Sequence, residues 1–316
     1  MAAPNSTFPA PIVVEPVSGT HRQTFILLHG RGSSADKFGP VLLDTPITST
    51  DDGGKDTVVT LATAFPHAKF IFPTAPRSRA TVYNRSRINQ WFDCWHVDAP
   101  RAEQEKREWL MIDGLQETVG FVHGLLQTEI ASVGAENVVL GGLSQGCAAS
   151  LTGLLLWEGE KIGACVGMCG WVPFLKSLTE AVPGAAGYED GEDNEDDPFE
   201  RSDPEDQPDD DAAEEDVAVK AVRTLREKLE MDDQPSLSGR PAVFETPIFL
   251  GHGTEDDRVP IDLGRDTERC LGAMGLGTSW IEYGGLGHWY SGAMLAHMVQ
   301  FLRTNTNWGQ TKDEGA

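Results

Sequence analysis

The sequence lacks the features that mark several large classes of protein. No apolar run approaches the roughly 18 residues of a membrane-spanning helix, and residues 1–16 have neither the basic start nor the apolar stretch of a signal peptide. Positive charge is scarce, because 25 lysines and arginines stand against 49 acidic residues for a net charge of −24. Such a chain lacks the basic footprint of a nucleic-acid binder, and an anionic membrane surface would repel it. We therefore expect neither a nucleic-acid partner nor stable membrane insertion.

Cysteine is also scarce, with five in 316 residues, and the odd number argues against a complete set of disulfides. Cys147, Cys165 and Cys169 lie among apolar or small residues, which is typical of buried free thiols. No pair has CxxC spacing, and no histidine cluster accompanies the cysteines at the spacing of a zinc site. The sequence therefore predicts reduced thiols, no bound metal and a cytoplasmic location.

The negative charge is concentrated in one segment. Residues 189–216 contain 17 acidic residues and one basic residue, Arg201, a local net charge of −16 that leaves −8 for the rest of the chain. The wider stretch 184–216 is rich in glycine and proline and has few apolar residues, so it cannot bury enough surface to offset the entropy of ordering. We expect one domain over residues 1–316, carrying a disordered acidic insertion at about 184–216.

Short apolar runs alternate with helical patterns along the rest of the chain. The runs are mostly continuous, which is typical of strands buried on both faces of a parallel sheet. They cover residues 11–17, 24–30, 68–73, 137–142, 163–168, 246–253 and 279–283. Helical spacing is present at 107–131, 146–157, 261–274 and 291–303, and an amphipathic segment occupies 217–231. This order predicts an α/β fold with a mostly parallel central sheet and helices on both faces.

The segment Gly142-Leu143-Ser144-Gln145-Gly146 follows one of these buried strands and opens a predicted helix. A nucleophilic serine at a tight strand-to-helix turn needs a strained backbone, and side chains two residues before and after it would collide. Glycine at those two positions fits this requirement. The pattern predicts Ser144 as a nucleophile; the simpler alternative is a glycine-rich turn with an incidental serine.

A nucleophilic serine needs a histidine base steered by a carboxylate, and in this type of fold the chain order is serine, acid, histidine. The histidines after Ser144 are His252, His288 and His297. His252 ends a strand too early to follow an acid, and His297 lies within the last helix pattern. His288 occupies a glycine-rich loop after the last predicted strand, so we predict that it is the base.

The acid should follow the preceding strand, where Glu255, Asp256 and Asp257 are adjacent and sequence reasoning cannot separate them. The oxyanion of an acyl-transfer reaction needs two backbone N–H donors. We predict Gln145, the residue after the nucleophile, and Arg31 in the loop after an early strand. His29 of the same loop is interpreted as a structural histidine that hydrogen-bonds to the backbone.

Together these motifs resemble the acyl-protein thioesterases, within the phospholipase/carboxylesterase family of α/β-hydrolases. The matching pieces occur in family order. They are LLHGRG (27–32), FPTAP (72–76), WFD (91–93), LGGLSQG (140–146), GWVP (170–173), GHGTEDDRVP (251–260) and YGGLGH (283–288).

The resemblance implies further assignments. It places the acid three residues before the Val of a Val-Pro pair, which here is Asp256, although Asp257 stands where the family often has proline and Thr254 where it often has aspartate. It also implies a hydrophobic acyl-binding groove, for which Trp91 and Trp171 are candidate walls. The implied reaction is serine hydrolysis of acyl thioesters or esters through an acyl-enzyme, without a cofactor.

The resemblance leaves the substrate open. S-acylated proteins are favoured, and a small-molecule carboxylesterase or lactonase, or a lysophospholipase, is the alternative. A hydrolase fold acting only as a binding protein is a further alternative of a different class. The stretch from residue 174 to 245 is longer than its family counterpart, and the sequence does not indicate its purpose or the oligomeric state.

Overall fold

The computed structural model describes residues 8–50, 56–185, 215–231, 239–306 and 308. The acidic insertion predicted at 184–216 lies outside the described residues from 186 to 214. In the described part of the chain, no helix is both long enough and apolar enough to cross a bilayer.

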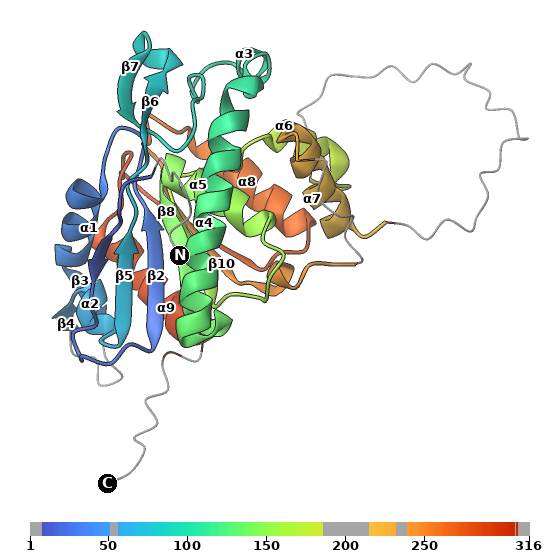
Figure 1. Ribbon diagram of the computed structural model, residues 1–316. Helices are drawn as coiled ribbons and strands as arrows, with labels where there is room; N and C mark the ends of the chain where they lie inside the picture. The colour runs from blue at the N-terminus through green and yellow to red at the C-terminus, as the bar shows by residue number, and fades with distance from the viewer. Residues whose placement is uncertain (1–7, 51–55, 186–214, 232–238, 307, 309–316) are drawn as a thin grey trace, which may run out of the picture.

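A seven-stranded sheet forms the centre of the molecule, with the strand order β1-β5-β2-β8-β9-β10-β11 (Figure 1). Its strands are β1 (Ile12–Val14), β2 (Gln23–Leu28), β5 (Ala68–Phe72), β8 (Val138–Leu143), β9 (Ala164–Met168), β10 (Ile248–Gly253) and β11 (Thr278–Tyr283). Only the edge pair β1–β5 is antiparallel, and the other pairs of this sheet are parallel. Each of the seven apolar runs predicted as a strand forms one strand of this sheet, which confirms the predicted fold class.

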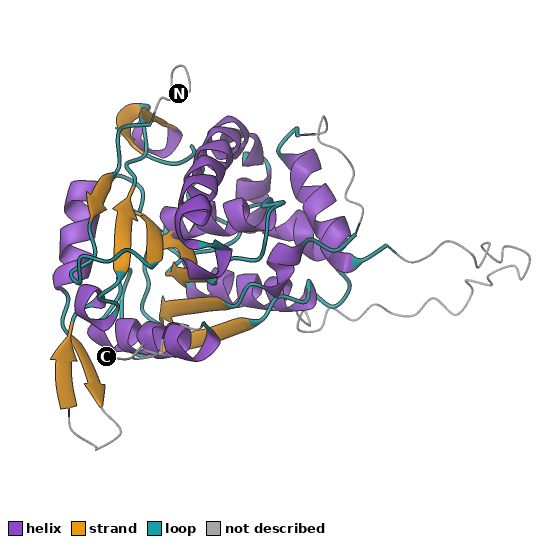
Figure 2. Cartoon of the chain, turned by 60° about the horizontal axis from the view of Figure 1, so that its bottom comes forward, coloured by secondary structure: helices purple, strands orange, loops and turns teal. Residues whose placement is uncertain are grey.

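Helices cover both faces of the sheet, giving three layers (Figures 1 and 2). One face packs against α1 (Ala35–Asp44), α2 (Leu61–Ala64) and α9 (Gly292–Asn305). The other packs against α4 (Ile112–Val133), α5 (Gln145–Leu155) and α8 (Ile261–Ala273). Helices α6 (Leu175–Ala181) and α7 (Val217–Lys228) extend this layer: they pack against each other, and α6 also packs against α8. The short helix α3 (Arg101–Glu105) precedes α4.

The continuous apolar strands supply both cores at once because successive side chains of a strand point to opposite faces. In β2, Phe25 and Leu27 belong to the core under α1 and α9, whereas Ile26 and Leu28 belong to the core under α4 and α5. Because these strands are parallel, their carboxyl ends lie at one common edge of the sheet, and the loops that follow them gather there.

Several elements were not predicted from the sequence. Two antiparallel ribbons stand outside the main sheet: β3 (Ile47–Thr50) with β4 (Asp56–Val59), and β6 (Arg77–Ala80) with β7 (Ser86–Asn89). The first projects away from the body of the molecule (Figure 2), and the second lies beyond the carboxyl ends of β2 and β5 (Figure 1). The β6–β7 strands are polar and short, with no apolar run to mark them. Helices α1, α2, α3 and α6 were also missed, and α1 contains Pro40, which normally disfavours helix.

Candidate active site

Ser144 lies at the sharp turn between β8 and α5, with backbone angles φ 58° and ψ −122° that a non-glycine residue rarely adopts. The flanking glycines are required by close packing. A Cβ at Gly142 would lie 2.6 Å from the backbone of Gly146, and a Cβ at Gly146 would lie 2.2 Å from the carbonyl oxygen of Leu28. The collision expected from the sequence pattern is therefore present in the fold, with β2 as an additional neighbour.

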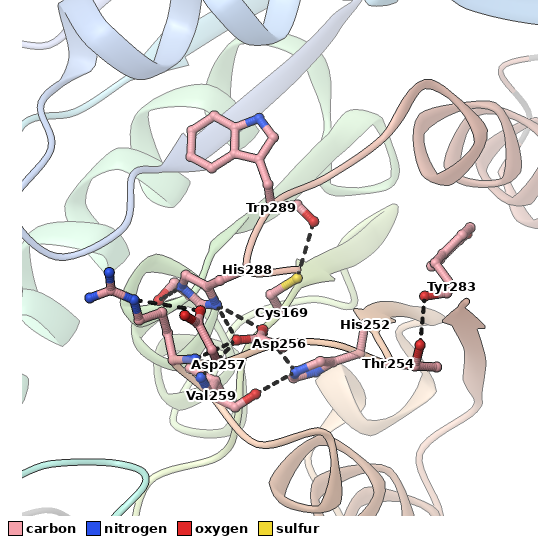
Figure 3. Close-up of polar contacts among 11 residues, drawn as sticks. Cys169, His252, Thr254, Asp256, Asp257, Val259, Tyr283, His288 and Trp289 are labelled. Atoms are coloured by element: carbon pink, nitrogen blue, oxygen red, sulfur yellow. Dashed lines mark hydrogen bonds and ion pairs between the residues drawn. The ribbon is translucent and has the colours of Figure 1, made fainter. Parts of the chain in front are cut away.

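His288 lies in the loop between β11 and α9, within hydrogen-bond distance of both of its predicted partners. Its Nε2 is 2.8 Å from the Oγ of Ser144, and its Nδ1 is 2.7 Å from Oδ2 and 2.9 Å from Oδ1 of Asp256. The structure thus brings together three side chains that come from different loops at the carboxyl edge of the sheet. Figure 3 shows the contact between His288 and Asp256.

The geometry distinguishes among the three adjacent carboxylates that the sequence left open. The Asp256 side chain is fully buried, and its Oδ1 accepts hydrogen bonds from the backbone N–H groups of Arg258 and Val259, each at 2.9 Å. The Asp257 side chain is 79% exposed and pairs with Arg258 at 3.6 Å, and Glu255 is exposed. Asp256 is therefore the carboxylate that faces His288.

The environment of Asp256 keeps its carboxylate ionised. Burial raises its pKa, but hydrogen bonds from His252, His288 and the backbone N–H groups of Val259 and Arg258 outweigh burial and hold the pKa well below its usual value. An ionised acceptor places the His288 hydrogen on Nδ1. The Nε2 atom is then free to accept the hydroxyl hydrogen of Ser144.

The loop of Arg31 lies beside the serine, as an oxyanion site requires. A Cβ at Gly30 would lie 3.4 Å from the Ser144 Cβ and 3.9 Å from its Oγ. Within the described residues, the backbone N–H groups of Arg31 and Gln145 have no hydrogen-bond acceptor. These two N–H groups are therefore available to an external oxygen, and the Gln145 N–H also lies at the positive end of α5.

The Gln145 side chain has a structural role that sequence reasoning missed. Its Oε1 accepts the backbone N–H of Trp91 at 3.0 Å, and its Nε2 donates to the Phe92 carbonyl oxygen at 2.8 Å. The serine turn is thereby tied to the WFD segment, residues 91–93. The signal available in the sequence was the presence of both motifs, but their spacing of more than 50 residues carried no sign of contact.

The two candidate tryptophans differ in position. Trp91 is buried and its Nε1 donates to the His29 carbonyl oxygen at 2.7 Å, so this hydrogen bond holds the backbone at the start of the loop that contains Arg31. Trp171 lines a cavity of about 560 Å³, whereas Trp91 lines a separate cavity of about 430 Å³. Neither Ser144 nor His288 lines the larger cavity. Gly170, the residue before Trp171, lies close to the serine turn, since a Cβ there would lie 3.2 Å from the Ser144 carbonyl oxygen.

Cys169 adds a thiol to the group, and its Sγ lies 3.3 Å from the Trp289 carbonyl oxygen (Figure 3). Ligand-type atoms of Cys169, Asp256 and His288 all lie within 4.8 Å of one another, a spacing that could hold a metal ion. A metal would compete for the same atoms through which His288 and Asp256 hydrogen-bond. Burial also raises the pKa of Cys169 to about 12, which disfavours the thiolate that binds metals.

The remaining histidines of the prediction lie as follows. His29 is buried, with Nδ1 2.8 Å from the Gly30 carbonyl oxygen and Nε2 accepting the Ala75 N–H at 3.1 Å, so it bonds to the backbone as expected. The Nδ1 of His297 in α9 contacts the Tyr283 hydroxyl at 3.0 Å. His252, set aside in the sequence analysis, contacts Asp256.

Comparison with known proteins identifies a family for this chain. Residues 10–186 match the phospholipase/carboxylesterase family. A protein of Yarrowia lipolytica named acyl-protein thioesterase 1 is 35% identical over 167 residues, covering 52% of this chain and 64% of that protein. The Candida albicans protein of the same name is 24% identical over 293 residues, covering 91% of this chain and 94% of that protein.

The fold is also similar to that of a solved structure, acyl-protein thioesterase 2 of Zea mays. The TM-score is 0.59 at 22% identity, and the match covers 93% of this chain and 98% of that one. The family match spans more than half of the chain and includes the turn of Ser144. The chain therefore belongs to the phospholipase/carboxylesterase family of α/β-hydrolases.

Proposed function

We propose that this protein is a serine hydrolase that removes acyl groups from thioesters or esters, with S-acylated proteins as its main substrates. The observation that carries the proposal is the position of His288, whose two ring nitrogens lie 2.8 Å from the Ser144 Oγ and 2.7 Å from the Asp256 Oδ2. The family match supports the reaction class, and the names of the Yarrowia and Candida relatives favour acyl-proteins as substrates.

The first half of the reaction forms an acyl-enzyme. Ser144 Oγ attacks the acyl carbonyl carbon while His288 Nε2 removes the hydroxyl proton. Asp256 holds the imidazole by its Nδ1–H and stabilises the positive charge that develops on the ring. His288 then gives the proton to the departing thiol or alcohol, and the acyl group stays on Ser144.

The second half of the reaction uses water. His288 Nε2 takes a proton from a water molecule, whose oxygen attacks the acyl-enzyme carbonyl carbon. His288 then returns the proton to Ser144 Oγ as the bond from Oγ to the acyl carbon breaks, which releases the carboxylic acid and restores Ser144. In both halves the N–H groups of Arg31 and Gln145 stabilise the tetrahedral oxyanion. The proposed chemistry uses only groups of this chain and water.

We further propose that the acyl chain occupies the 560 Å³ cavity, whose volume lies within the roughly 300–1,000 Å³ of small-molecule sites. Its apolar lining includes Cys94, Val97, Met111, Trp171, Phe174 and Leu263. Cys94 connects the cavity to the oxyanion loop, because its Sγ lies 3.0 Å from Arg31 Nη1. Trp171 is thus the proposed acyl-contacting tryptophan, while Trp91 supports the oxyanion loop.

A cytoplasmic location is part of the proposal. All five cysteines are buried and unpaired. Burial raises the pKa of Cys147, Cys165, Cys169 and Cys270, so these thiols are held in their neutral form. Reduced buried thiols are typical of proteins in a reducing compartment.

The proposal is tested by two measurements. A fluorophosphonate probe should label the wild type and fail to label Ser144→Ala; an unlabelled but folded wild type would contradict a catalytic role. A hydrolysis panel should then compare acyl thioesters with matched oxygen esters across chain lengths. Faster turnover of small oxygen esters than of thioesters would favour the carboxylesterase alternative. Trp171→Ala should alter the chain-length preference if the cavity holds the acyl chain.

A further inference from the structure

His252 lies near the end of β10, behind the carboxylate that faces His288. Its side chain is 1% exposed, and its Nε2 is 3.2 Å from the Asp256 Oδ2 and 2.9 Å from the Val259 carbonyl oxygen. Figure 3 shows Asp256 between the two imidazole rings, with His288 on one side and His252 on the other. Asp256 is therefore approached by two histidines that come from separate segments of the chain.

The contacts of His252 determine where its hydrogen resides. Both neighbours of Nε2 are acceptors, so Nε2 carries the hydrogen. The hydrogen bond goes to the Val259 carbonyl oxygen at 2.9 Å, and Oδ2 of the ionised Asp256 carboxylate lies 3.2 Å from the same nitrogen. The Nδ1 atom is buried and has no hydrogen-bond partner in the described part of the chain. It packs against α8, where a Cβ at Gly264 would lie 2.6 Å from it. A hydrogen placed on Nδ1 would be a buried donor without an acceptor in the described residues, so the single ring hydrogen belongs on Nε2.

The two carboxylate oxygens of Asp256 have different contacts, and His252 Nε2 lies beside Oδ2. The backbone N–H groups of Arg258 and Val259 both reach Oδ1. His288 Nδ1 contacts both oxygens, 2.7 Å from Oδ2 and 2.9 Å from Oδ1, and His252 Nε2 lies 3.2 Å from Oδ2. Because the loop's own backbone fixes only one oxygen, the orientation of the other depends on the two imidazoles.

We propose that His252 is a positioning residue, whose Nε2–H, bonded to the Val259 carbonyl oxygen and lying beside Oδ2 of Asp256, keeps the carboxylate facing His288. It does not touch the substrate and acts through Asp256. This inference rests on the proposed hydrolase function. It predicts that variants of His252 lose catalytic rate when no donor nitrogen stands at the place of Nε2, and keep it when one does. A loss of stability alone would not depend on this position.

Two substitutions separate the donor from the bulk of the ring. In His252→Gln the amide nitrogen can reach the place of Nε2, whereas in His252→Asn it reaches only the place of Nδ1. We expect kcat of the Asn variant to fall about 100-fold with an unchanged KM, as for a misplaced catalytic group. The Gln variant should stay within about 10-fold of the wild type, since it retains the donor. Equal activity of the two folded variants would overturn the proposal.

The pH profile gives a readout that a purely structural role would not change. Without the His252 donor, Asp256 becomes a stronger acceptor for His288, so the acidic limb of kcat/KM should move to higher pH in the Asn variant and not in the Gln variant. The matched control is His123→Asn, which removes another imidazole–carbonyl contact, to Gly153, away from the site. The control should leave the acidic limb unchanged even if it lowers stability.

The outcome can be distinguished from a failure of the proposed function. Fluorophosphonate labelling of the wild type, with Ser144→Ala as the unlabelled control, tests the function first. The NMR resonance of the proton between His288 Nδ1 and Asp256 then tests positioning without any need for turnover. It should shift in His252→Asn and stay near its wild-type position in His252→Gln; the same resonance in all three proteins would overturn the inference.

Discussion

The dipeptide His-Gly occurs twice at the carboxyl edge of the sheet, and the two histidines have different contacts. His29 directly follows β2, and both of its ring nitrogens bond to backbone, to the Gly30 carbonyl oxygen and the Ala75 N–H. His252 is the penultimate residue of β10, with one nitrogen between Val259 and Asp256 and the other without a partner in the described residues. Both rings are fully buried.

The difference shows that burial and sequence context do not determine the role of a histidine. His29 is satisfied by backbone groups and keeps a loop in shape. His252 places its Nε2 between the Val259 carbonyl oxygen and the carboxylate of the proposed triad, and its Nδ1 has no partner in the described residues. Two observations point to the proposed positioning role of His252. Its buried Nδ1 has no partner in the described residues, and its Nε2 lies beside Asp256, whose pKa is held below its usual value.

The largest expected effect concerns the carboxylate itself. Asp256→Asn should reduce kcat roughly 10,000-fold, because a neutral amide no longer fixes the His288 tautomer or stabilises its cation. Steady-state kinetics on an acyl thioester would measure this. Asp257→Asn is the matched control and should leave kcat near the wild-type value, since that side chain is 79% exposed. Equal losses in both variants would contradict the assignment of Asp256.

The next effect concerns the glycine of the second loop. A Cβ at Gly253 would lie 2.1 Å from the Leu286 carbonyl oxygen and 2.7 Å from that of Gly287, immediately before His288. Gly253→Ala should therefore displace the histidine loop, lower kcat about 100-fold and reduce stability. Kinetics together with thermal unfolding would measure both changes. Wild-type kinetics in this variant would show that the loop adapts without moving the imidazole.

The pH dependence of stability should single out His29. Burial lowers its pKa from about 6.5 to about 4. The unfolded chain therefore binds a proton that the folded chain excludes, and this contribution to stability is full above pH 6.5 and is lost as the pH falls toward 4. The loss at pH 4 is roughly 3 kcal/mol. Urea unfolding at pH 7 and pH 4.5 should show a smaller decrease in the free energy of unfolding for His29→Gln than for the wild type.

The smallest effect concerns the glycine of the first loop. A Cβ at Gly30 would meet the Ser144 Cβ at 3.4 Å, an ordinary contact distance, and no backbone clash stands in its way. Gly30→Ala should fold with near wild-type stability and lower kcat about 10-fold by crowding the oxyanion site. A lower thermal unfolding temperature for Gly30→Ala than for Gly253→Ala would contradict the conclusion that, of these two glycines, only Gly253 is packed tightly against backbone.

The sequence predicts the sheet well because its strands are buried on both faces and read as continuous apolar runs. All seven became strands, whereas the polar β6–β7 ribbon had no such run and was missed. Ser144 and His288 follow from glycine spacing and chain order. The sequence could not separate Glu255, Asp256 and Asp257 as the acid, because the conformation of the turn after β10 determines which carboxylate points inward.

Contacts between distant segments could not be predicted in the same way. The bond of the Gln145 side chain to Trp91 joins residues 54 positions apart. The approach of His252 to Asp256 spans only four positions, but it requires the chain to turn back on itself immediately after β10. Neither leaves a periodic pattern, because each depends on one side chain rather than on a face of a helix or strand.

The strained backbone of Ser144 has a consequence for how this protein can change. A residue with φ 58° and ψ −122° costs of order 1–3 kcal/mol, a cost that glycine would largely relieve. A selection for thermal tolerance alone would therefore favour loss of the hydroxyl at this turn. The proposed nucleophile is therefore a residue that folding by itself would discard.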